Sequence, residues 1–144
     1  MWIVFAILAS VFWGLTYVVN EQVYKHISIY SSLAITLVIA GIVTGIYAYF
    51  TGTLPKDLVT MTSSARVFTL VAVGTALLIL AEIFIALSIV GKNATIAGLV
   101  EISYPLFIAV FAYLLFRESQ LTAGAALGGA LIFLGITVIY IFNR

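Results

Sequence analysis

The stretch that decides the fold is ATIAGLVEISYPLFIAVFAYLLF, residues 94–116, in which Glu101 is the one charged side chain. A helix needs about 20 predominantly apolar residues to cross a hydrocarbon core of about 30 Å. The stretch therefore predicts a transmembrane helix. Strands of a membrane barrel would be about 10 residues long and would alternate in polarity, and this sequence shows no such alternation.

The composition agrees with a membrane protein. Of 144 residues, 65% are hydrophobic and 8% are charged, whereas a soluble domain carries about 25% charged residues. The net charge of +1 gives no basic field, so we expect no nucleic-acid partner. The sequence contains no Cys, which excludes disulfides and thiolate metal sites. A chain of this length is expected to form one domain, residues 1–144.

Four more apolar runs are long enough to cross a bilayer. We predict an all-α integral membrane protein with spans at residues 2–20, 28–50, 67–90, 94–116 and 121–142, because only helices satisfy the backbone in runs this long. Ser28, Ser63 or Ser64, and Asn93 are candidate helix caps, and Gly91 is a candidate helix end. The connection at residues 51–66 contains Pro and charges, so we expect it in the interface or in water.

The distribution of basic residues between the two membrane sides is even. Five spans place the termini on opposite sides, A for the N-terminal side and B for the other. Side A is expected to hold Lys56, Arg66 and Arg117, and side B Lys25, Lys92 and Arg144. Since the Lys/Arg bias sets orientation, the tie is either uninformative or indicates dual topology. In the second case, copies inserted both ways would pair as an antiparallel homodimer, which resembles an inverted repeat.

Small residues at helical spacing favour close helix packing, within one chain or between two. Gly41 and Gly45 form a GxxxG pair in the second span, Gly124 and Gly128 form another in the fifth, and Ala125 and Gly129 lie beside the latter.

Two acids, Glu82 and Glu101, fall inside spans, and ionisable residues at membrane depth mark functional sites by default. With a rise of about 1.5 Å per residue, Glu82 lies roughly 5 Å and Glu101 roughly 6 Å from the midplane toward side B. Lys92 is expected about 14 Å of helical rise away. Burial and a second nearby carboxylate both disfavour the charged form, so at least one acid is expected to hold a proton near neutral pH. The alternative is a structural acid, protonated and hydrogen-bonded to a neighbouring helix.

The surroundings of Glu101 strengthen the interpretation as a site for protons or a cationic substrate. Pro105 lacks an N–H and so frees the carbonyl of Glu101. Gly98 thins the same face one turn earlier, and Tyr104, at i+3, can lie beside the acid.

The first span contributes two aromatic residues, Trp13 and Tyr17, in its half toward side B. Their faces would favour a cation near the acids, although lipid-facing or packing roles are equally open. The sequence shows no catalytic triad, metal-ligand spacing or phosphate loop. We therefore expect neither an enzyme nor a bound metal or cofactor.

Two segments carry a family resemblance. ASVFWGLTYVVNEQVYKHIS, residues 9–28, resembles the opening helix of an EamA-type domain of the drug/metabolite transporter superfamily. ALSIVGKNATIAGLVEISYPLFIAVFAYLLFRESQLTAGAALGGALIFLGITVI, residues 86–139, resembles the closing block of that domain, with Pro105, Arg117-Glu118 and a Gly-rich last helix.

The resemblance implies a transporter of small metabolites, amino acids or drugs. Typical members contain two five-helix halves in inverted orientation, and this chain resembles one half, which would need a second copy or a partner half. Many members carry an Arg early in the second helix, where this chain reads SSLAIT. Glu82 and Glu101 are not general family positions, so their role rests on the physical argument alone.

Three hypotheses follow. The first is a dual-topology homodimeric transporter of small molecules, cationic or amino-acid-like, in which Glu101, with Glu82, binds protons or substrate. The second is a subunit of a hetero-oligomeric transporter, and the third is a structural or regulatory membrane protein. A prokaryotic inner membrane is the expected location.

Overall fold

The computed structural model describes residues 1–119 and 122–142, so two sequence-based predictions, a span beginning at Leu121 and a basic residue at Arg144, fall outside the described residues. Within these ranges all regular structure is helical. The helices are α1 (Trp2–Val23), α2 (Ile29–Phe50), α3 (Thr53–Ser63), α4 (Ala65–Gly91), α5 (Ala94–Glu101), α6 (Tyr104–Phe116) and α7 (Ala123–Phe142).

The prediction of an all-α protein with five membrane spans is confirmed. In the described residues, α1, α2, α4 and α7 are each long and apolar enough to cross a bilayer, and α5 and α6 together form the fifth such segment, Ala94–Phe116.

The helix ends follow local capping chemistry. Ser28 Oγ accepts from Ser31 N at 3.2 Å, and Asn93 Oδ1 accepts from Ile96 N at 2.8 Å, so each cap satisfies an amide that the first turn leaves free.

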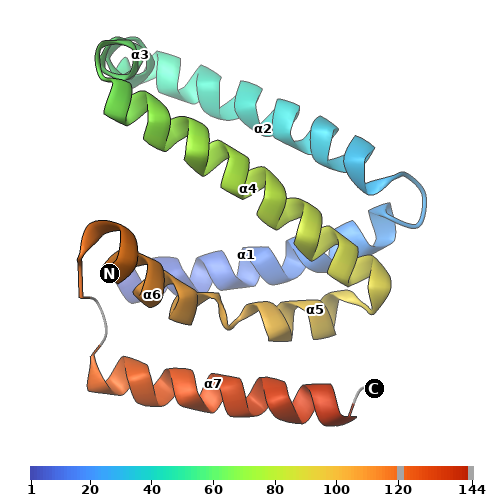
Figure 1. Ribbon diagram of the computed structural model, residues 1–144. Helices are drawn as coiled ribbons and strands as arrows, with labels where there is room; N and C mark the ends of the chain where they lie inside the picture. The colour runs from blue at the N-terminus through green and yellow to red at the C-terminus, as the bar shows by residue number, and fades with distance from the viewer. Residues whose placement is uncertain (120–121, 143–144) are drawn as a thin grey trace. The chain divides into compact units, whose positions relative to one another are not determined.

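The chain divides into two compact units, which we describe separately. One comprises Met1–Val18 and the chain from Gly91 onward, and the other comprises Val19–Val90. In the first unit, α7 runs alongside the chain segment formed by α5 and α6 (Figure 1). In the second unit, α3 is drawn end-on where α2 ends and α4 begins, so its axis runs across theirs (Figure 1).

Helix α3 was not predicted, because the sequence pattern of residues 51–66 indicated a connection. Pro55 is the misleading residue. It falls in the first turn of α3, where amide groups have no intrahelical partner and a missing N–H costs little. Gly52 allows the sharp turn from α2 into α3, since its φ of 70° lies in the left-handed region that favours glycine.

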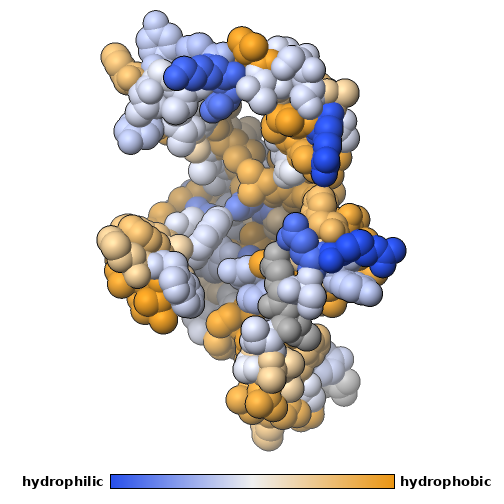
Figure 2. Space-filling model, turned by 90° about the vertical axis from the view of Figure 1, so that its left-hand side faces the viewer, coloured by the Kyte–Doolittle hydropathy of each residue, from blue (hydrophilic) through white to orange (hydrophobic). Residues whose placement is uncertain are grey.

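Few side chains are buried. The buried hydrophobic residues among those described are Leu33, Ala86, Ile89, Ala94 and Ala97. Most large hydrophobic side chains are exposed, and hydrophobic residues are widespread on the face drawn in Figure 2. Apolar surface on this scale is not left open to water. The bilayer, or another membrane-embedded chain, must therefore cover it.

Gly129 of α7 lies close against the side chain of Leu106 of α6. A Cβ built at Gly129 would lie 2.1 Å from Leu106 Cδ2. A Cβ at Gly124 or Gly128 would meet no described atom of the unit within 4 Å. Beside the contact lies an apolar groove of about 300 Å³ between α6 and α7.

This contact predicts a difference between adjacent glycines. Gly129→Ala should be less stable than Gly128→Ala by about 1–3 kcal/mol, the usual cost of overpacking a close contact. Both variants gain the same helix propensity, about 1 kcal/mol over glycine, so the comparison isolates the steric effect. Thermal unfolding of the purified variants in detergent would measure it. Equal unfolding midpoints for the two variants would mean that Leu106 moves aside without a loss of stability.

Candidate functional site

The fifth span breaks immediately after Glu101. Helix α5 ends there, Ile102 and Ser103 link the two helices, and α6 begins at Tyr104. The main-chain ladder ends with Ile102 N donating to Gly98 O at 3.1 Å and Ser103 N donating to Val100 O at 3.3 Å.

Pro105 explains the position of the break. Because it has no N–H, it cannot donate to the carbonyl four residues earlier, which belongs to Glu101. The backbone bonds resume with Leu106 N donating to Ser103 O at 3.0 Å. A discontinuous membrane helix of this kind places polar backbone groups at membrane depth, where they are tolerated only inside protein or beside a water-filled cavity.

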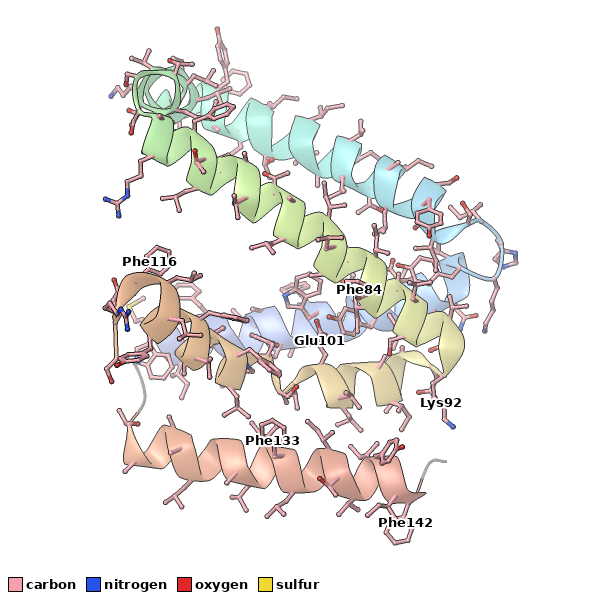
Figure 3. The ribbon with its side chains drawn as sticks, in the orientation of Figure 1. Phe84, Lys92, Glu101, Phe116, Phe133 and Phe142 are labelled. Atoms are coloured by element: carbon pink, nitrogen blue, oxygen red, sulfur yellow. The ribbon has the colours of Figure 1, made fainter. Side chains whose placement is uncertain are left out.

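Glu101 is hydrogen-bonded to the first span. The hydroxyl of Tyr17 on α1 donates to Oε2 of Glu101, and both side chains are half-buried. Figure 3 shows Glu101 at the C-terminal end of α5. The two residues are 84 positions apart in the sequence, so this bond joins the beginning of the chain to the point at which the fifth span breaks.

Gly98 leaves room for the Tyr17 ring beside this bond. A Cβ at Gly98 would lie 3.4 Å from Cδ2 and 3.6 Å from Cε2 of the Tyr17 ring. The ring therefore lies against the backbone of α5 one turn before Glu101. A residue larger than alanine at position 98 would push the ring, and with it the hydroxyl, away from the carboxylate.

Trp13 places a second aromatic ring on α1 beside that of Tyr17. It lies one turn before Tyr17, and the two ring centroids are 5.7 Å apart at an interplanar angle of 55°. The structure thus brings together four residues that the sequence indicated as a site: Trp13, Tyr17, Gly98 and Glu101. We refer to these four as the Glu101 cluster.

Tyr104 differs from its sequence-based expectation in its surroundings. It starts α6 and is 56% exposed, and it makes no hydrogen bond or ring contact with the described residues of the Glu101 cluster. The i+3 spacing that favoured a contact presumes a continuous helix, and the break at residues 102–103 interrupts that helix.

Glu82 lies in the other unit, half-buried on α4. It is close enough to Tyr24, in the turn after α1, to affect its ionisation. Burial raises the pKa of Tyr24, and the negative charge of Glu82 raises it further. The sequence did not single out Tyr24 as part of a site.

The Glu101 cluster combines a carboxylate, a hydroxyl donor and two aromatic faces. An ionised Glu101 can accept the Tyr17 hydrogen bond, a proton or an organic cation, and the aromatic faces favour a positive charge nearby. No group of three or more His, Asp or Glu residues able to hold a metal ion occurs within residues 1–119 and 122–142.

Comparison with known families and proteins gives one match. The model of the EamA-like transporter family matches residues 1–141. No curated protein and no solved structure matches the chain.

Proposed function

Since this chain belongs to the EamA-like transporter family, we propose that it carries small cationic or amino-acid-like molecules across its membrane as an antiparallel homodimer, with Glu101 as the binding carboxylate. Membership in the family makes it a membrane transporter of the drug/metabolite type. The substrate class, the dimer and the role of Glu101 are our proposal.

The Tyr17–Glu101 hydrogen bond carries the proposal. A carboxylate at membrane depth is costly to keep charged, by about 2.5–3.5 kcal/mol on insertion scales. In this chain the acid lies at a helix break and accepts a hydrogen bond from an aromatic residue of another span. This arrangement supports a group that alternates between a bound proton and a bound cation.

In the proposed cycle, proton and substrate compete for one carboxylate. When Glu101 is ionised it holds the cation, with the rings of Trp13 and Tyr17 beside it. When a proton binds, the charge that holds the cation is lost and the substrate leaves. A proton gradient can therefore drive substrate in the opposite direction, provided that the site opens to each side in turn.

Two observations support the antiparallel dimer. The Lys and Arg residues divide evenly between the sides expected from five spans. In both GxxxG pairs, Gly41 with Gly45 and Gly124 with Gly128, a Cβ added to either glycine would have no described atom of its own unit within 4 Å. The face at Gly41 and Gly45 is therefore open to a second copy, whereas Gly128 also lines the groove between α6 and α7.

A topology experiment combined with transport tests this proposal. The sequence has no Cys, so Thr60→Cys on side A and His26→Cys on side B each introduce a unique label site. For a dual-topology protein, a membrane-impermeant maleimide applied to intact cells should label about half of the copies of each variant. The purified parent protein, alone in liposomes, should accumulate organic cations against a pH gradient.

A fixed orientation would give full labelling of one variant and none of the other, and would exclude the antiparallel homodimer. If the protein in fixed orientation were also inactive alone, it would be the subunit of a hetero-oligomer. Labelling of detergent-solubilised protein controls for the reactivity of each Cys.

A further inference from the structure

Helix α3 divides into an apolar and a polar face. At 3.6 residues per turn, the apolar side chains Leu54, Leu58 and Met61 share one face of Thr53–Ser63. Lys56 and Thr60 lie on the opposite face. Asp57 borders the apolar face beside Met61, and the helix has the pattern of one that lies between two media of different polarity.

The hydroxyl groups of α3 are compatible with a helix at the boundary between water and lipid. Thr60 Oγ1 donates to Lys56 O at 3.1 Å, and Thr62 Oγ1, on the apolar side, donates to Leu58 O at 2.9 Å. The threonines therefore satisfy their donors within the helix and need no water on the apolar side.

The position of α3 along the chain holds it at the surface of the bilayer. It follows α2 after Thr51 and Gly52, and it precedes α4 by Ser64 alone. Both neighbours are membrane spans. With 11 residues, α3 is about 16 Å long, which is too short to cross a core of about 30 Å. Its axis runs across those of α2 and α4 (Figure 1), which is the direction of the membrane plane.

The chain itself covers part of the apolar face. Leu54 and Met61 are half-buried, whereas Leu58 is 46% exposed. At the top of Figure 2, where α3 lies in Figure 1, hydrophilic and hydrophobic side chains lie side by side. The open part of the apolar face lies at the level at which two spans leave the hydrocarbon core.

We propose that α3 is an interfacial helix that binds the lipid surface on side A. Leu58 faces the acyl chains, and Lys56 and Thr60 face the headgroups and water. Amphipathic helices of this type bury their apolar face about 5–10 Å into the boundary between headgroups and acyl chains. Lipid is the occupant because the short links on both sides keep α3 at the level where spans α2 and α4 end. This surface is separate from the Glu101 cluster and does not depend on the transport proposal.

Fluorescence quenching tests the depth of α3. Because the sequence has no Cys, Leu58→Cys can be labelled with an environment-sensitive nitrobenzoxadiazole dye, with Thr60→Cys as the matched control on the polar face. Both proteins are reconstituted in phosphatidylcholine liposomes. Iodide should quench the Thr60→Cys label at least about threefold more strongly than the Leu58→Cys label, and a lipid carrying a nitroxide near the headgroup should show the opposite preference.

Two results would overturn the proposal. Equal iodide quenching of the two labels would place α3 in water. A Leu58→Cys label shielded from both iodide and the lipid nitroxide would show that protein, from a second copy or another chain, covers the apolar face. Leu58 is 46% exposed, so its replacement removes little packing, and gel filtration of both variants confirms that they are folded.

Discussion

Glu101→Gln should reduce pH-driven uptake of every transported substrate to the level of protein-free liposomes. Glutamine has nearly the same shape, and its amide oxygen can still accept the hydrogen bond of Tyr17. It can neither bind and release a proton nor offer a negative charge to a cation. The substitution therefore removes the chemistry and preserves the packing.

The measurement is uptake of a panel of organic cations and amino acids by purified protein in liposomes with an imposed pH gradient. Glu118→Gln, in the segment after α6, is the matched control and should keep the parent rate. A Glu101→Gln protein that transports the whole panel as well as the parent does would remove the carboxylate from the mechanism. The family assignment would be unaffected, because it does not depend on Glu101.

Gly98→Val should abolish the same transport, whereas Gly98→Ala should retain it. The alanine Cβ would meet the Tyr17 ring at 3.4 and 3.6 Å, which are ordinary van der Waals distances. The two additional carbon atoms of valine have no such space. They would displace the ring and break the bond between Tyr17 and Glu101, at a cost of about 1–3 kcal/mol for overpacking.

Uptake and thermal unfolding of both variants would distinguish an effect on transport from an effect on stability. Alanine is the better helix former by about 1 kcal/mol over glycine, so Gly98→Ala should unfold at a temperature equal to or higher than that of the parent. Equal transport by the two variants would mean that the approach of α1 to α5 has no part in function. Loss of transport in both variants would mean that Gly98 has a role other than leaving room for the Tyr17 ring.

The division between α5 and α6 has a mechanical consequence for the site. Glu101 is the last residue of α5, and Tyr104 is the first residue of α6. Two short helices joined at a break change their mutual angle more readily than one continuous helix, because Pro105 removes one bond of the ladder there. The carboxylate thus lies at the break in the fifth span, which suits the alternating site that we propose.

Much of the architecture could be predicted from the sequence because it depends on local properties. The length of an apolar run determines whether it crosses a bilayer, and Ser28 and Asn93 cap their helices through amides three residues on. The fifth span also shows from its sequence alone that Glu101 is a charged residue in an apolar run and that Pro105 interrupts the helix. Pro55 concealed α3, because the same residue type breaks a helix in its interior and is tolerated in its first turn.

Other features were decided only by the tertiary structure. Trp13 and Tyr17 were equally open to lipid-facing roles, and no local pattern shows that the Tyr17 hydroxyl reaches a carboxylate 84 residues away. The sequence marked Gly129 as one of several small residues that favour close packing, and only the structure shows that it packs against Leu106. By itself, the sequence determined which segments enter the membrane and which acid is out of place there, since burial in lipid depends on composition. Which side chains meet depends on how the helices cross and rotate, and only the packed structure defines that.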